Sequence, residues 1–251
     1  MQKLESKIIV NLGDSIFGNF RPPVDISSFL AEKTDATVFN CGFGGTRMCY
    51  EDSPRDALSG YRLAEAIATR KWILQDNALS PNVQWKNKKD YFFDTLALLK
   101  SIDFSKVDII TIAYGTNDFG AGCPVTNPDD SYDTHSFSGA LQHSIEALRS
   151  AYPHAKIVLC TPIWRCWRDD EQTVIDTAQS KIIGGQKLLQ FVEQVKNIAA
   201  KHSLLCIDNY NHCGICLDTQ HLCFNGKDGT HPNEIGRHMI ADYMANILLH
   251  N

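Results

Sequence analysis

The amino-acid sequence predicts an α/β protein with a three-layer α/β/α sandwich, and three observations support this prediction. Short apolar segments rich in β-branched residues alternate with longer amphipathic segments along the chain. The apolar segments are continuously apolar rather than alternating in polarity, which is typical of strands buried on both faces of a parallel sheet. Neither a repeat nor a low-complexity linker divides the 251 residues. We therefore expect one domain, spanning residues 1–251.

Five apolar segments are expected to be the strands of this sheet. They run from Lys7 to Asn11, Ala36 to Asn40, Val107 to Tyr114, Lys156 to Thr161 and Leu204 to Asp208. Each is short and bounded by glycine or polar residues, as buried strands are.

Amphipathic segments between the strands are expected to be helices. They run from Ile26 to Thr34, Tyr61 to Trp72, Tyr91 to Ser101, Phe137 to Ala151, Lys187 to Lys201 and Glu234 to Leu249. Asp25 and Asn233 directly precede two of them and are expected N-caps. The polar segment from Gly120 to Ser136 contains two prolines and is expected to be a surface loop.

Composition excludes several classes of protein. The 24 Lys and Arg and 29 Asp and Glu give a formal net charge of −5, which argues against a dedicated nucleic-acid binder. No apolar run approaches the roughly 18 residues of a membrane span, and the first seven residues lack a signal-peptide core. Nine cysteines, an odd number, are best explained as reduced thiols, so we expect a cytoplasmic protein.

Chemically useful residues follow the predicted strands. Gly13-Asp14-Ser15 follows the first strand, the segment Asn40 to Thr46 ends the second, and Gly115-Thr116-Asn117-Asp118 follows the third. Asp228-Gly229-Thr230-His231 precedes the last helix. Ligands of open parallel sheets bind at the carboxyl ends of the strands. One edge is thus expected to gather a hydroxyl, an imidazole, a carboxylate, a carboxamide and glycine amides, the groups that acyl transfer requires.

These four blocks together resemble the SGNH hydrolase superfamily, the GDSL-type esterases and lipases. They occur in the family's order from residue 13 to residue 231. The resemblance implies a flavodoxin-like fold with five parallel strands in the order 2-1-3-4-5, which agrees with the five strands expected above. It also implies a serine esterase that hydrolyses carboxylic esters through an acyl-enzyme, with no metal and no organic cofactor.

By position, the resemblance makes Ser15 the nucleophile, His231 the general base and Asp228 the residue that orients the histidine. A serine hydroxyl is a poor nucleophile until an imidazole removes its proton, and the imidazole needs a partner on its other nitrogen. An Asp three residues before a His on one loop is close enough to supply that hydrogen bond.

The resemblance also implies an oxyanion hole formed by the N–H groups of Ser15 and Gly45 and the side-chain amide of Asn117. Gly45 is preferred over Gly42 and Gly44 because the family's donor glycine lies five residues after the Asn of its block, here Asn40. A glycine presents its N–H without a Cβ in the way.

Each block also has an ordinary structural interpretation. Ser15 would serve as a helix cap, and the glycines of the second block as turn residues. Asn117 and Asp118 would form an Asx turn and a cap, and His231 would lie in a loop without reacting. The joint occurrence of the blocks at one sheet edge favours the catalytic interpretation.

Three further residues are candidates for the substrate pocket. Thr46 and Arg47 follow the glycine block, although Arg47 is equally explained as a solvated loop charge. Trp164, after the fourth strand, is a candidate pocket wall, with core or lid packing as its alternative. An exposed aromatic patch at Trp164 and Trp167 would allow a homodimer.

Two further expectations concern metal binding and the substrate. Cys213-x-x-Cys216 has the spacing of a zinc knuckle, but a second close pair is missing, so no metal is expected.

The expected substrates are short-acyl esters, above all acetyl esters of carbohydrates. The alternatives are a lysophospholipase or thioesterase, which an apolar groove near Tyr61 to Trp72 would favour, and a non-catalytic or flavin-binding flavodoxin-like module.

Overall fold

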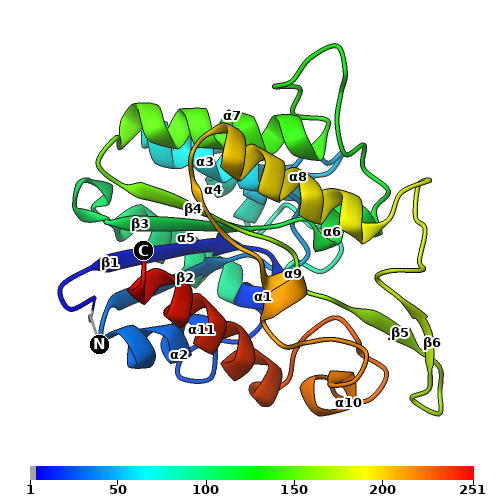
Figure 1. Ribbon diagram of the computed structural model, residues 1–251. Helices are drawn as coiled ribbons and strands as arrows, with labels where there is room; N and C mark the ends of the chain where they lie inside the picture. The colour runs from blue at the N-terminus through cyan, green and yellow to red at the C-terminus, as the bar shows by residue number, and fades with distance from the viewer. Residues whose placement is uncertain (1–3) are drawn as a thin grey trace.

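The computed structural model describes residues 4–251 and is built on one five-stranded parallel sheet (Figure 1). The order β2-β1-β3-β4-β7 confirms the predicted 2-1-3-4-5 topology, since β7 is the fifth strand of this sheet along the chain. The strands are β1 (Ile8–Gly13), β2 (Thr37–Gly42), β3 (Ile109–Ala113), β4 (Lys156–Cys160) and β7 (Leu205–Ile207).

The centre of the sheet is buried on both faces. All five residues of β3 are buried, as are all residues of β1 after Ile8. This burial explains why these strands are continuously apolar in sequence instead of alternating.

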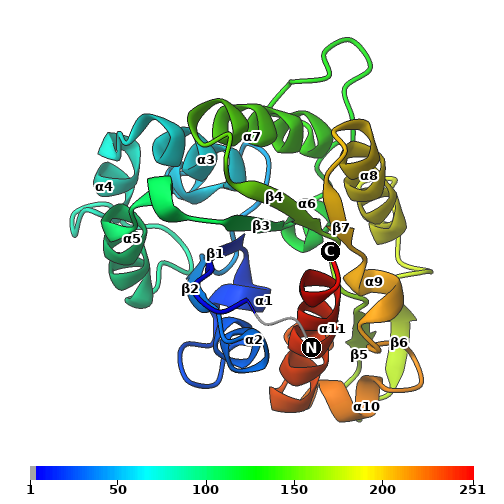
Figure 2. The same ribbon diagram turned by 60° about the vertical axis from the view of Figure 1, so that its left-hand side comes forward.

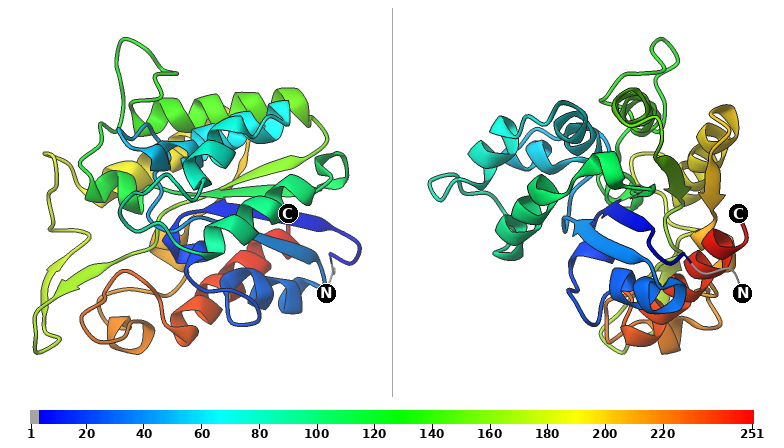
Figure 3. Two further views of the ribbon diagram at one scale, coloured as in Figure 1. Left: turned by 180° about the vertical axis from the view of Figure 1, so that it is seen from behind. Right: turned by 90° about the vertical axis from the view of Figure 1, so that its left-hand side faces the viewer.

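Helices cover both faces of the sheet, as predicted. Figure 3 shows α2 and α11 packed together on one face and α3, α7 and α8 on the other. The longer helices are α2 (Ile26–Thr34), α3 (Gly60–Thr69), α4 (Ile73–Leu79), α5 (Tyr91–Ser101), α7 (Phe137–Ala151), α8 (Leu188–Lys201) and α11 (Glu234–Leu249).

The two predicted N-caps are confirmed. Oδ1 of Asp25 accepts from the N–H groups of Ser27 and Ser28 at the start of α2. Oδ1 of Asn233 accepts from the N–H of Gly236 at the start of α11. Both caps satisfy N–H groups that lie outside the helical hydrogen-bond ladder.

Short elements are where the sequence prediction fails. The segment expected to be one helix from Tyr61 to Trp72 contains the end of α3 at Thr69 and a break at Arg70, whose φ of 57° is left-handed. The sequence prediction also misses the seven-residue helix α4, which follows the break. The shorter elements missed are the antiparallel pair β5 (Cys166–Arg168) and β6 (Val174–Thr177) and the helices α1 (Ser15–Gly18), α6 (Thr116–Gly120), α9 (Asn209–His212) and α10 (Gln220–Cys223). Elements of three to five residues are too short for a periodic pattern to show.

The β5–β6 hairpin projects past the carboxyl ends of the strands and lies next to α10 (Figures 1 and 2). The prediction of an exposed aromatic patch just before this hairpin is wrong for Trp164. This side chain is 1% exposed, and its Nε1 donates to Oε1 of Gln179. Trp167 is half-buried against Phe119.

No helix in the described part of the chain is long and apolar enough to cross a membrane.

A buried polar contact links the sheet to α2. Asn11 lies opposite Thr111 in the register of β1 and β3, and its Oδ1 accepts from the Thr111 hydroxyl at 2.7 Å. Its Nδ2 donates to Oγ of Ser27 in α2 at 2.8 Å. All three side chains are buried, so each depends on the others for hydrogen bonding.

We therefore expect Asn11→Ala to lower the free energy of unfolding by about 1–3 kcal/mol for each buried hydroxyl that it leaves without its partner. Urea unfolding followed by circular dichroism measures this loss. The exposed Asn82→Ala is the matched control and should change stability by less than about 0.5 kcal/mol. Equal stability of the two variants would contradict a role for this contact.

Candidate active site

Ser15 lies just beyond the carboxyl end of β1, which pairs with β2 and β3 in the sheet. The chain leaves β1 at Gly13, and Asp14 caps α1 by accepting from the N–H of Ile16 at 2.9 Å. Ser15 is the first residue of α1 and is 5% exposed. The cap of this helix is therefore Asp14, and the hydroxyl of Ser15 is free for another contact.

That contact is with His231, which lies 216 positions further along the chain. Nε2 of His231 is 2.9 Å from Oγ of Ser15, and Nδ1 is 2.7 Å from Oδ2 of Asp228. The hydroxyl, the imidazole and the carboxylate thus form one hydrogen-bonded series. In such a series the carboxylate fixes the imidazole tautomer that can accept the hydroxyl proton.

The loop that carries His231 is held by its own backbone and by the hairpin. Oδ1 of Asp228 accepts from the N–H groups of Thr230 and His231 at 2.8 and 3.0 Å. The N–H of Cys166 in β5 donates to the carbonyl of Gly229 at 3.0 Å. The hairpin that the sequence did not reveal therefore helps to position the predicted histidine.

The hydrogen bonds to Asp228 keep it ionised. Burial opposes ionisation, but the bonds from the His231 ring and from two backbone N–H groups outweigh it, and the pKa of Asp228 falls to about 2. Asp228 is thus a carboxylate at neutral pH, as an orienting partner of histidine has to be.

Of the three candidate glycines, Gly45 has the amide that is free to bind a ligand. The N–H of Gly42 donates to Oδ1 of Asn40, and the N–H of Gly44 donates to the hydroxyl of Tyr91. Within residues 4–251 the N–H of Gly45 has no hydrogen-bond partner. Its φ of +79° is one that glycine adopts without strain, and an added Cβ would lie 3.0 Å from Nη1 of Arg55.

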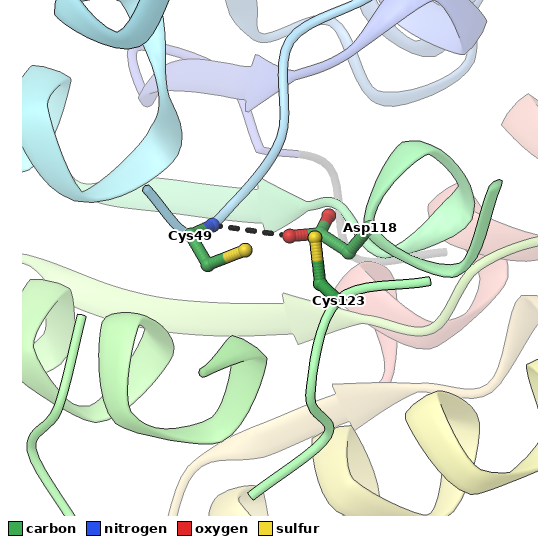
Figure 4. A group of neighbouring side chains, drawn as sticks. All are labelled: Cys49, Asp118 and Cys123. Atoms are coloured by element: carbon green, nitrogen blue, oxygen red, sulfur yellow. Dashed lines mark hydrogen bonds between the residues drawn. The ribbon is translucent and has the colours of Figure 1, made fainter. Parts of the chain in front are cut away.

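Asn117 and Asp118 hold the glycine loop from the other side. Nδ2 of Asn117 donates to the carbonyl of Thr46 at 2.9 Å, which leaves the second hydrogen of this amide available. Asp118 accepts at 3.0 Å from the N–H groups of Met48 and Cys49 (Figure 4 shows the Cys49 contact). Neither side chain caps α6, whose N-cap is Gly115, so the Asx-turn and cap interpretation is wrong.

The three predicted pocket residues differ in how far their side chains are exposed to solvent. Thr46 and Trp164 are each 1% exposed, and the Thr46 hydroxyl donates to the carbonyl of Phe43. Neither offers surface that a substrate could reach in this structure. Arg47 is half-buried, with Nη1 3.7 Å from Sγ of Cys123 and Nε 3.7 Å from Glu51.

Cys49, Asp118 and Cys123 form a buried group whose ligand-type atoms lie within 4.8 Å of one another (Figure 4). Because Asp118 accepts from the backbone N–H of Met48 at both carboxylate oxygens, it holds the loop that follows Gly45 in place.

The Cys213 and Cys216 pair belongs to no group of three such ligands in the described residues. Cys213 is buried, whereas Cys216 is exposed.

Asp14, the residue before Ser15, has a carboxyl group with an unusual pKa. Burial raises the pKa of Asp14 to about 7, against the lowering effects of the Ile16 N–H and of nearby His231. The Gly-Asp-Ser block gives no sign of this, because the shift arises from the packing of distant segments around the carboxyl group.

Comparison with known families identifies the class of this protein, a hydrolase of carboxylic esters. The model of the GDSL-like Lipase/Acylhydrolase family matches residues 11–238, and the chain belongs to this family. No curated protein matches the chain in sequence.

Solved structures that resemble this chain share its fold over nearly its whole length. A possible lipase from Chitinophaga pinensis is 20% identical with a TM-score of 0.61, covering 96% of this chain and 97% of that one. An aryl esterase from M. smegmatis is 16% identical with a TM-score of 0.57, covering 96% and 98%. A carbohydrate acetylesterase from Sinorhizobium meliloti is 14% identical with a TM-score of 0.55, also covering 96% and 98%.

The raised pKa of Asp14 predicts how stability depends on pH. Between about pH 4 and pH 7 the folded protein keeps a proton that the unfolded chain, with its ordinary carboxyl pKa of 3.8, releases. The free energy of unfolding should therefore fall as pH rises through this range, and Asp14→Asn should reduce the fall.

Urea unfolding of both proteins at pH 5 and pH 8 tests this expectation. The exposed Asp94→Asn variant should show the wild-type pH dependence. If Asp14→Asn shows it too, Asp14 does not titrate in this range.

Proposed function

We propose that the protein is a serine esterase in which Ser15 is the nucleophile, His231 the general base and Asp228 the residue that orients His231. The observation that carries the proposal is the hydrogen-bonded series from Ser15 Oγ through the His231 ring to Asp228, with contacts of 2.9 and 2.7 Å. Both contacts lie within the distances at which a proton can be transferred or held.

In the proposed reaction, Oγ of Ser15 attacks the ester carbonyl while Nε2 of His231 takes the hydroxyl proton. The tetrahedral intermediate collapses, His231 gives the proton to the leaving alcohol, and an acyl-enzyme forms on Ser15. Water then attacks the acyl-enzyme with His231 again as base, which releases the acid and restores Ser15. Asp228 stabilises the imidazolium in both halves and stays ionised.

The N–H groups of Ser15 and Gly45 and the side-chain amide of Asn117 form the proposed oxyanion hole. Ser15 begins α1, so its N–H lies outside the helical ladder. The Gly45 N–H is without a partner in the described chain, and Asn117 is held by one of its two amide hydrogens. Fixed donors of this kind stabilise the charge that develops on the carbonyl oxygen.

For the substrate, we propose short-acyl esters, above all acetyl groups on carbohydrates. The similar fold of the Sinorhizobium meliloti carbohydrate acetylesterase supports this choice. The long-acyl alternative requires an apolar groove at the nucleophile. A groove of about 310 Å³ does lie near Tyr61 to Trp72, lined by Arg62, Leu74 and Ala78 among others, but Ser15, His231 and Asn117 are not among its lining residues.

The proposal also includes the cellular compartment and the oligomeric state of the protein. All nine cysteines, which lie in the described residues, are free thiols in the structure, which supports a reducing compartment such as the cytoplasm. A homodimer stays a prediction, and it loses the support of an aromatic patch because Trp164 is buried.

Ser15→Ala should reduce the hydrolysis of p-nitrophenyl acetate to the background rate, because no other group in the series can form the acyl-enzyme. The exposed Ser150→Ala is the matched control and should keep wild-type kcat and KM. A panel of p-nitrophenyl esters from acetyl to palmitoyl, together with acetylated xylo- and gluco-oligosaccharides, measures the acyl and leaving-group preference.

Full activity of Ser15→Ala would remove Ser15 as nucleophile. A preference for palmitoyl over acetyl esters would replace the short-acyl proposal by the lipid one. Flavin bound to the purified protein, with no ester turnover, would favour the non-catalytic module.

A further inference from the structure

One hydroxyl, that of Tyr91, lies between the helix that carries Ser15 and the loop that carries Gly45. Tyr91 is the first residue of α5, an element that contributes nothing to the four sequence blocks. Its hydroxyl accepts from the N–H of Gly44 at 2.8 Å and donates to Oδ1 of Asn19 at 3.3 Å. Tyr91 thus touches the residue just before the proposed oxyanion donor.

Asn19 connects this hydroxyl to the nucleophile. Asn19 is the C-cap of α1, and its backbone N–H donates to the carbonyl of Ser15 at 3.1 Å. Nζ of Lys89, two residues before Tyr91, also donates to Oδ1 of Asn19, at 3.2 Å. The Tyr91 hydroxyl therefore joins the turn of Ser15 to the glycine loop through a single side chain.

The glycine loop needs such a connection because it contains two consecutive glycines. Glycine loses its backbone freedom only when neighbouring contacts restrict it. Gly45 lies between two restraints, the Gly44 N–H on the Tyr91 hydroxyl and the Thr46 carbonyl on Nδ2 of Asn117. An oxyanion donor has to be fixed before the reaction, since a donor that reorients during the reaction contributes less.

We propose that Tyr91 is a positioning residue, whose hydroxyl fixes the Gly44–Gly45 backbone so that the Gly45 N–H points at the developing oxyanion. This inference rests on the proposed function, because it assigns Gly45 an oxyanion role. Tyr91 acts through Gly44 and is not itself expected to touch the substrate.

The packing around the hydroxyl shows how closely it holds the loop. A Cβ added to Gly44 would lie 2.5 Å from Oδ1 of Asn19 and 2.7 Å from Oη of Tyr91, so both atoms lie directly against the Gly44 backbone. The guanidinium of Arg21 lies over the Tyr91 ring, 5.1 Å from its centroid. Burial raises the pKa of Tyr91 to about 12, so the hydroxyl keeps the proton that it donates to Asn19.

The test compares Tyr91→Phe with Tyr152→Phe. Tyr152→Phe likewise removes one hydrogen-bonded tyrosine hydroxyl, which donates to the carbonyl of Ile67 at 2.9 Å, away from the site. For p-nitrophenyl acetate, Tyr91→Phe should lower kcat about tenfold and change KM less than twofold, because the misdirected donor acts in the transition state. Tyr152→Phe should leave both constants unchanged.

Asn117→Ala is the reference variant for a larger effect, because the complete loss of an oxyanion donor lowers kcat by about 100- to 1000-fold. Thermal unfolding of the two Tyr→Phe variants separates a catalytic loss from a loss of fold. If Tyr91→Phe does not fold, Gly44→Ala replaces it, because the Cβ would displace the loop from Tyr91 and should produce the same loss of kcat at constant KM.

A wild-type kcat in folded Tyr91→Phe, or a rise in KM with kcat unchanged, would overturn the inference. In that case an inactive Ser15→Ala would leave the proposed function standing. If Ser15→Ala kept its activity, the proposed function itself would fail, whatever Tyr91→Phe showed.

Discussion

The structure depends on one constraint, which is that the segment after β1 and the loop before α11 meet at the carboxyl edge of the sheet. Ser15 follows the first strand and His231 precedes the last helix, yet their side chains are 2.9 Å apart. The packing of α11 against α2 brings the C-terminal segment beside the N-terminal one, as the views in Figures 2 and 3 show. The contact between this hydroxyl and this imidazole therefore exists only when both segments are folded together.

A second feature is that the groups around Ser15 are fixed by contacts from elements distant in sequence. The β5–β6 hairpin holds the loop of His231 through Gly229, α6 holds the glycine loop through Asn117 and Asp118, and α5 reaches the same loop through Tyr91. Hydrogen-bond donors that are fixed in advance do not have to reorganise during the reaction.

Much of the fold could be predicted because its pattern is strong. Continuous apolar strands and helices of nine or more residues leave a clear periodicity, and the sheet order followed from the resemblance to a known family. Ser15, Asp228 and His231 could be singled out because their sequence blocks, after the first strand and before the last helix, resemble those of a known family. The buried state of Trp164, the titration of Asp14 and the contact of Tyr91 with Gly44 could not, because each depends on which distant segments pack together.

The most direct test of the central claim is chemical labelling of the activated hydroxyl. An alkyl fluorophosphonate forms a stable ester with a serine whose proton a neighbouring base removes, and fluoride leaves. Peptide mapping by mass spectrometry should find one adduct, on Ser15, in the wild-type protein, and none in His231→Ala. An adduct on another residue, or equal labelling of Ser15 without His231, would contradict the claim that this hydroxyl and this imidazole act as a pair.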